Sequence, residues 1–145
     1  MPPRDATTTC VFVPDEILIE RGCEDTTMAR RCRARAPHVP VTVIDDRRAL
    51  AGGDFAAAKR RLVLARRRGA VLEHCPAGTR GLACCNYLVL TFASNCPMDC
   101  RYCFLQEYLA GNAPLTAYVE PETALAEVAE LLDRHPERQF RIGSG

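Results

Sequence analysis

The sequence predicts an α/β protein in which short strands alternate with helices. In the first half, short apolar runs at residues 10–13, 41–44 and 62–65 are typical of strands, and residues 15–35 have helical character. In the second half, a nearly continuous apolar run at residues 87–92 is typical of a strand buried on both faces. Strands separated by helical stretches indicate a small parallel sheet.

Prolines and glycines divide the first half of the chain. Pro14 ends the first predicted strand, and Pro37 and Pro40 break the helical stretch. A loop or short helix then separates the second predicted strand from the third. We therefore expect an N-terminal α/β domain over residues 1–80 and a second unit over residues 81–145. The predicted linker between them is marked by Gly69, Pro76, Gly78 and Gly81.

The second half predicts the opening of a βαβ unit. A cysteine-rich loop follows the apolar strand, and a short helix at residues 104–109 and a brief extended segment at 117–119 come next. A longer helix is predicted over residues 121–134, because a proline stands at its first position and Pro136 follows its end. Residues 139–142 begin another strand. The apolar face of the longer helix comprises Ala124, Leu125, Val128, Leu131 and Leu132.

Length and composition exclude several classes of protein. The 145 residues are about one domain's length, and 48% hydrophobic with 26% charged residues excludes a disordered or collagen-like chain. No apolar run approaches the roughly 18 residues that span a bilayer. No apolar segment follows the N-terminal Met1, so we expect a cytoplasmic protein without a membrane partner. Nine cysteines in such a chain indicate metal or redox chemistry rather than a disulfide scaffold.

Charge is unevenly distributed along the sequence. Residues 28–68 hold twelve basic and three acidic side chains, whereas the segments 1–27 and 104–145 are each net acidic. A basic block of this kind is able to contact phosphate groups, so DNA is a possible partner. The simpler interpretation is a solvated arginine-rich surface. Single-strand binders stack bases on aromatic side chains, and Phe55 is the only aromatic residue between positions 28 and 68.

The strongest chemical signal is a C-x3-C-x2-C triplet formed by Cys96, Cys100 and Cys103. Thiolates are preferred ligands of iron–sulfur clusters and of zinc. Three cysteines would bind three irons of a cubic cluster and leave the fourth open to a small molecule, as a catalytic site requires. The alternative is zinc held by Cys100 and Cys103 with two further ligands. Those two ligands would come from His74, Cys75, Cys84 and Cys85.

The same loop carries a family resemblance. An aromatic residue, Tyr102, stands directly before the last cysteine, and the loop follows a buried strand, which resembles the radical S-adenosylmethionine superfamily. Within that superfamily, residues 85–109 resemble spore photoproduct lyase and its relatives. Residues 62–65, 75–78 and 84–87 are also similar to that group. The resemblance covers the chain from about residue 10 onward, and residues 85–109 are its specific part.

The resemblance implies a radical enzyme. Cys96, Cys100 and Cys103 would ligate a 4Fe–4S cluster, whose open iron binds S-adenosylmethionine. Reductive cleavage would produce a 5′-deoxyadenosyl radical that abstracts hydrogen from a substrate, with damaged DNA as one candidate. The family also implies a one-electron donor of the flavodoxin or ferredoxin type. Cofactor contacts would come from Tyr102, at the adenine end, and from Gly143, Ser144 and Gly145, near the methionine amino group.

Two departures from the family qualify this reading. The family's catalytic domain is a partial (β/α) barrel of the TIM type, and a full barrel needs about 250 residues. We therefore expect a fragment that holds the N-terminal parallel α/β unit and the first βαβ portion of a truncated barrel. Lesion-repairing lyases also use a hydrogen-donating cysteine beyond the cluster loop, and none follows Cys103 here. A non-DNA substrate, or a binding module without turnover, are the alternatives.

Overall fold

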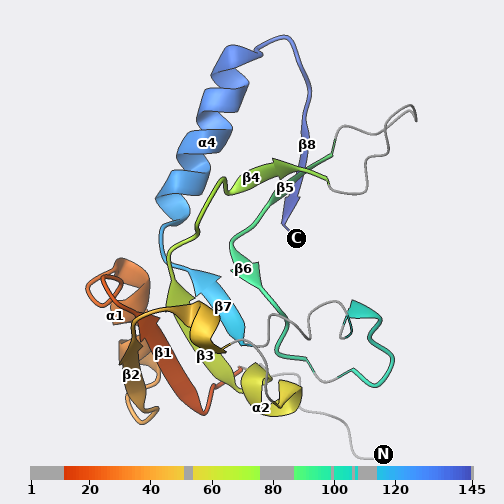
Figure 1. The fold of residues 1–145 in the computed structure, drawn as a ribbon. Coiled ribbons are helices and arrows are strands. Elements are labelled where there is room, and N and C mark those ends of the chain that lie inside the picture. The colour runs from red at the N-terminus through yellow and green to blue at the C-terminus, as the bar shows by residue number, and fades with distance from the viewer. Residues whose placement is uncertain are drawn as a thin grey trace, which may run out of the picture.

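The computed structural model describes residues 12–50, 54–75, 87–98, 100–105, 107 and 114–144. These residues form two sheets with helices beside them (Figure 1). The strands of the larger sheet are, in spatial order, β2 (Val41–Ile44), β1 (Glu16–Glu20), β3 (Arg61–Ala65), β7 (Leu115–Tyr118) and β6 (Ala93–Ser94). Those of the smaller sheet are β4 (Leu72–His74), β5 (Tyr87–Leu90) and β8 (Arg141–Ser144). The helices are α1 (Thr27–Arg35), the 3-10 helix η1 (Arg47–Leu50), α2 (Phe55–Lys59) and α4 (Pro121–Arg134).

The larger sheet is parallel except at one edge, which confirms the predicted α/β fold class. β1 pairs in parallel with β2 and β3, and β3 pairs in parallel with β7. Only β6 is antiparallel to its neighbour. The sheet contains strands from both sides of residue 80, since β6 and β7 follow that position. The division of the chain into domains at residue 80 stays a prediction.

The central strands are buried on both faces because successive side chains point to opposite sides of a sheet. Ile17 and Ile19 of β1 face α1 and share a core cluster with Leu64 of β3. Leu18 and Val63 lie in a second cluster on the opposite face. Helix α1 begins where the Thr26 hydroxyl accepts a hydrogen bond from the amide of Ala29, at 3.3 Å.

Three local predictions were wrong. Residues 15–35 were expected to have helical character, but Glu16–Glu20 form β1, whose apolar centre is an Ile-Leu-Ile run suited to a buried strand. The strand expected at residues 10–13 does not include Phe12 or Val13, and the earlier part of that range lies outside the described residues. The predicted linker contains β4, which pairs with β5.

The second half matches the prediction more closely. Helix α4 has the predicted bounds, Pro121–Arg134, and β5, β7 and β8 lie where strands were expected. β5 and β8 are parallel neighbours, as a βαβ unit requires, and the chain reaches β8 by way of α4. Of the helix predicted over 104–109, helical backbone is described at Leu105 and Glu107. Among the described residues, no helix has the length and apolar character needed to cross a membrane.

Candidate functional site

The cysteine loop begins at a fixed backbone turn. Asn95 has a φ of 69°, in the left-handed region that asparagine tolerates better than most residues. Its side-chain oxygen accepts a hydrogen bond of 2.7 Å from the amide of Cys96. This turn directs the chain out of β6 and into the loop that carries the three cysteines.

A buried lysine of the N-terminal half holds the loop. Lys59, at the end of α2, is only 6% exposed, and its Nζ donates a hydrogen bond of 2.6 Å to the carbonyl oxygen of Met98. The same ammonium lies 4.9 Å from the centre of the Phe55 ring, a cation–π contact. In Figure 1 the loop after β6 lies beside α2. Nothing in the spacing of the sequence identified Lys59 as a partner of the loop.

The three predicted ligands lie on this loop with their thiols in no disulfide. Cys96 and Cys103 are half-buried and Cys100 is exposed. Among the described residues, no group of three or more Cys, His, Asp or Glu side chains is positioned to hold a metal ion. The loop therefore supplies the donor atoms for a metal without gathering them around one point.

Apolar and aromatic side chains of the loop face solvent. Tyr102 is fully exposed, Phe104 is 88% exposed, and Met98 and Leu105 are also exposed. An aromatic ring next to the last cysteine is thus accessible to a ligand. The predicted contact between Tyr102 and a cofactor stays a prediction.

The second predicted cofactor segment lies at the end of β8. Leu90 of β5 pairs with Ser144 of β8, and because the strands are parallel their carboxyl ends meet at one edge of the sheet. The chain leaves β5 from this edge toward the cysteine loop. Gly143 and Ser144 thus lie at the sheet edge from which the loop departs, and Gly145 lies outside the described residues.

Gly143 also has a packing role. A Cβ at this position would overlap the Tyr87 hydroxyl, so the phenol side chain occupies the space that glycine leaves. Tyr87 opens β5, and Gly143 pairs with the neighbouring Val89. The glycine therefore has a structural reason within the sheet, independent of any approach to a cofactor.

The remaining cysteines are placed away from the loop or lie outside the described residues. Burial raises the pKa of the Cys23 and Cys32 thiols, which pack in the core around α1. Cys75 is half-buried, and its amide donates to the carbonyl of Tyr87. Cys10, Cys84 and Cys85 lie outside the described residues.

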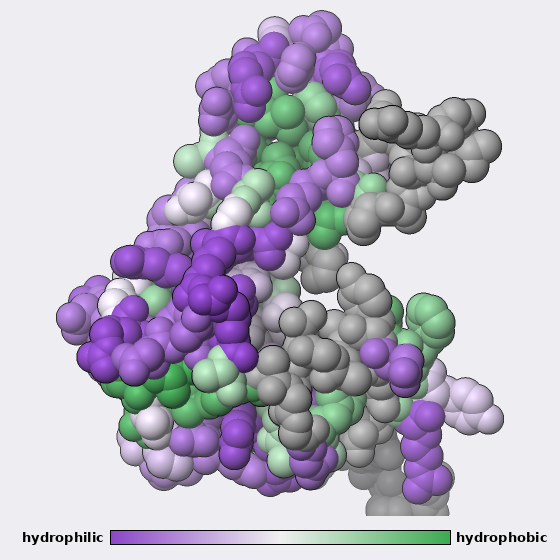
Figure 2. All heavy atoms as spheres, in the orientation of Figure 1, coloured by the Kyte–Doolittle hydropathy of each residue, from purple (hydrophilic) through white to green (hydrophobic). Residues whose placement is uncertain are grey.

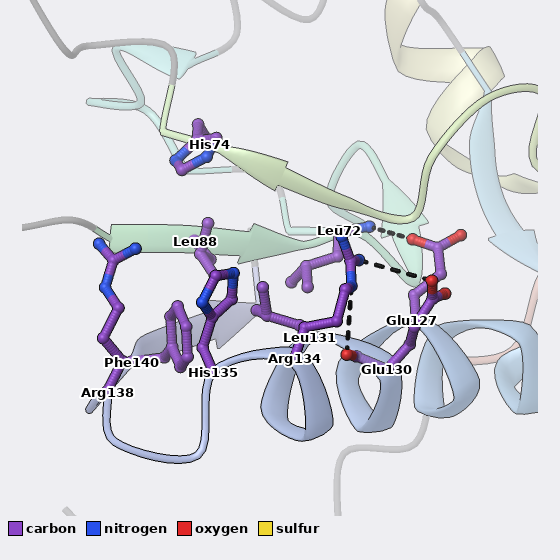
Figure 3. Close-up of a pocket in the computed structure, with 10 residues that line it drawn as sticks. All are labelled: Leu72, His74, Leu88, Glu127, Glu130, Leu131, Arg134, His135, Arg138 and Phe140. Atoms are coloured by element: carbon purple, nitrogen blue, oxygen red, sulfur yellow. Dashed lines mark hydrogen bonds and ion pairs between the residues drawn. The ribbon is translucent and has the colours of Figure 1, made fainter.

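A cavity of about 350 Å³ lies between α4 and the smaller sheet (Figure 3), and no residue of the cysteine loop lines it. Glu127 of α4 closes one end, since its carboxylate accepts hydrogen bonds from the amides of Val71 and Leu72 at 3.0 and 2.9 Å. Figure 2 shows hydrophobic residues in this space, bordered by hydrophilic ones. The cavity is the space left where α4 lies against the smaller sheet. His74 lines it and belongs to no metal-binding group among the described residues.

The fold matches solved structures of spore photoproduct lyase. A variant of that enzyme with bound AdoMet and dinucleoside spore photoproduct superposes with a TM-score of 0.74, and the enzyme complexed with dinucleoside spore photoproduct with 0.72. Each match covers 92% of this chain and 40% of the other, at 17% sequence identity. The chain thus shares the fold of spore photoproduct lyase over almost its whole length and spans 40% of that enzyme. No family model and no curated protein sequence matches the chain.

Proposed function

We propose that this chain is the cluster-binding part of a radical S-adenosylmethionine enzyme related to spore photoproduct lyase. One observation carries the proposal: a C-x3-C-x2-C loop follows β5 and β6 in a chain whose fold matches that enzyme. Cys96, Cys100 and Cys103 would hold a [4Fe–4S] cluster, and AdoMet would bind beside it.

The donor set fits such a cluster in its chemistry. Three thiols stand on one loop of eight residues, none is in a disulfide, and three thiolates leave one iron of a four-iron cluster free for a small ligand. Because the thiols are not gathered around one point, binding would draw the loop together. When bound, the cluster and AdoMet supply one-electron reductive cleavage followed by hydrogen-atom abstraction.

The chain's own residues would position these groups. Asn95 fixes where the loop starts, and Lys59 ties its middle to the end of α2 through the carbonyl of Met98. The exposed ring of Tyr102 offers a stacking surface for the adenine. Backbone groups at Gly143 and Ser144 offer polar contacts at the edge of the smaller sheet. The one-electron donor would be of the flavodoxin or ferredoxin type.

Anaerobic reconstitution with iron and sulfide tests the proposal. We expect a brown protein whose reduced cluster gives an electron paramagnetic resonance signal that shifts when AdoMet is added. Cys100→Ala should abolish the signal, and Cys32→Ala, a matched change in α1, should preserve it. A colourless zinc protein would contradict the proposal and favour a binding module. So would a cluster signal that is indifferent both to AdoMet and to Cys100→Ala.

For the substrate, we propose a lesion in DNA, since the matched enzyme is named for a spore photoproduct and has a solved structure complexed with dinucleoside spore photoproduct. A flipped or unstacked base would have to reach the loop, and damaged bases unstack at the lowest cost. Filter binding with irradiated and unirradiated DNA measures this preference. Equal retention of the two DNAs would instead favour a substrate other than damaged DNA.

A further inference from the structure

A basic hollow of about 310 Å³ lies beside the start of the cysteine loop, between η1, the turn after β3, and strands β6 and β7. We propose that this hollow binds a phosphate group. Nothing in the resemblance assigns it, and it stands apart from the metal-ligand set. Its lining residues are Arg47, Arg48, Arg67, Ser94, Pro114, Thr116 and Tyr118.

The charge of the hollow is positive. Three of its lining side chains are guanidiniums, and none of the described lining residues is acidic. Arg48 is paired with Asp46, at 2.6 Å, and Arg67 with Glu73, at 3.1 Å. Among the described residues, no carboxylate lies within 4 Å of the Arg47 guanidinium. Within the described part of the chain, the Arg47 guanidinium thus brings the hollow a positive charge that is in no ion pair, although the Arg47 backbone amide donates to the Glu20 carboxylate, at 3.4 Å.

A buried tyrosine orders two of these arginines. Arg47 donates a hydrogen bond of 2.9 Å to the Tyr118 hydroxyl, and its guanidinium carbon lies 5.0 Å from the ring centre. The Arg67 guanidinium lies 5.5 Å from the same centre. Two cations held against one ring repel each other, and a bound anion would relieve that repulsion. The planar fork of arginine also matches the oxygens of a phosphate.

The electrostatics of Tyr118 agree with this arrangement. Burial raises the pKa of Tyr118, but the hydrogen bonds that its hydroxyl receives, led by the one from Arg47, outweigh burial and hold the pKa below its ordinary value. The surroundings of the hydroxyl therefore favour negative charge. A phosphate placed against the same donors would experience the same field.

Two hydroxyls also line the hollow, and each has a partner within the protein. The Thr116 hydroxyl donates to the Pro114 carbonyl oxygen, at 3.3 Å, and Ser94 of β6 interacts with the Tyr118 hydroxyl, so the guanidiniums are the donors that a phosphate would use. Ser94 stands two positions before Cys96, so the hollow adjoins the predicted cluster loop through the chain itself. A phosphate held here would belong to a molecule that can also extend toward the loop. Figure 2 shows hydrophilic residues gathered where the chain passes from β3 toward β4.

Binding of inorganic phosphate and of a labelled thymidine octamer to the 145-residue chain, without iron, tests the inference. We expect both to bind, and Arg47→Gln to weaken both by about tenfold or more, since a hydrogen-bonded charge is lost. The slope of log affinity against log salt concentration for the octamer should also fall by about one. Phosphate binding needs no cluster. Absence of phosphate binding would therefore leave the proposed function standing, and failed cluster reconstitution would leave the phosphate site standing.

Two variants control the experiment. Arg30→Gln removes one charge from the same basic block on the exposed side of α1, and should change binding less than about twofold. Arg48→Gln removes a second lining cation without touching Tyr118, so it tests the hollow if Arg47→Gln does not fold. Equal weakening by Arg30→Gln and Arg47→Gln, or no phosphate binding by the native chain, would overturn the proposal.

Two forms of the octamer distinguish the sources of the phosphate. If the hollow takes a phosphodiester of a nucleic-acid backbone, octamers with a 5′-hydroxyl and a 5′-phosphate should bind alike. If it takes a terminal or small-molecule phosphate, the 5′-phosphorylated octamer should bind more tightly, and inorganic phosphate should compete with it. Either result supports a phosphate site, provided that the native chain binds inorganic phosphate; if it does not, the site is excluded.

Discussion

Replacing Lys59 by methionine should loosen the cysteine loop without unfolding the protein. Methionine keeps much of the aliphatic stem and removes the ammonium that donates to the Met98 carbonyl over 2.6 Å. A hydrogen bond to a charged group contributes about 1.5–3 kcal/mol. The global free energy of unfolding should change by less than about 1 kcal/mol, because a buried charge is removed and the carbonyl of the exposed Met98 regains water.

The expected effect is therefore local. A loss of about 1.5–3 kcal/mol corresponds to roughly tenfold to 150-fold more frequent opening of the loop. Hydrogen exchange measured by mass spectrometry should show faster exchange in the peptide spanning residues 95–103 and unchanged exchange in α4. Arg60→Met is the matched control, since Arg60 is exposed and pairs with Asp15 at the surface. Unchanged exchange in residues 95–103, or equal acceleration by Arg60→Met, would refute the anchoring role of Lys59.

Three further substitutions test the fold. Leu64→Ala, in the fully buried centre of β3, should lower the free energy of unfolding by about 2–5 kcal/mol in urea titrations; a loss below about 1 kcal/mol would contradict the described core. Thr26→Ala should cost about 1 kcal/mol by removing the cap of α1, whereas the exposed Thr27→Ala should cost much less, and equal costs would argue against the cap. Gly143→Ala should lower the free energy of unfolding by about 1–3 kcal/mol through overlap with Tyr87. Adding Tyr87→Leu in the same chain should reduce that loss, and an undiminished loss would place the strain elsewhere.

Local signals determined which elements the sequence could predict. Helix α4 was predicted to its end residues because a proline at its first position, an apolar face and Pro136 all act within the helix itself. The strand β1 was mistaken for helix because a run of five residues has too few turns to distinguish the two periods. The two residues of β6 carry no strand pattern, and their pairing with β7 depends on residues more than twenty positions away.

The same distinction applies to the site. The cysteine spacing predicts a metal ligand set from eight consecutive residues, and the described structure places all three on one loop. The anchor at Lys59 could not be predicted, because it lies 39 positions from Met98 and its helix shows no signal for a distant carbonyl. The basic block was visible in the sequence, but only folding distinguishes Arg47 from the solvated arginines of α1, by bringing Tyr118 to it from 71 positions away.

Strand β7 connects the two candidate sites, the cysteine loop and the basic hollow, because it follows the loop in the chain and carries Thr116 and Tyr118 of the hollow. After the cysteine loop, the chain returns to the larger sheet, where β7 pairs with β3. This pairing places Tyr118 against arginines of the N-terminal half. Three residues after Tyr118 the chain enters α4, which leads to β8 beside β5. The segment that runs from β7 into α4 therefore positions both the hollow beside Tyr118 and the sheet edge at Ser144. A substrate whose phosphate occupies the hollow would be held by the same framework that supports the cysteine loop, so binding at one site and order at the other should be coupled.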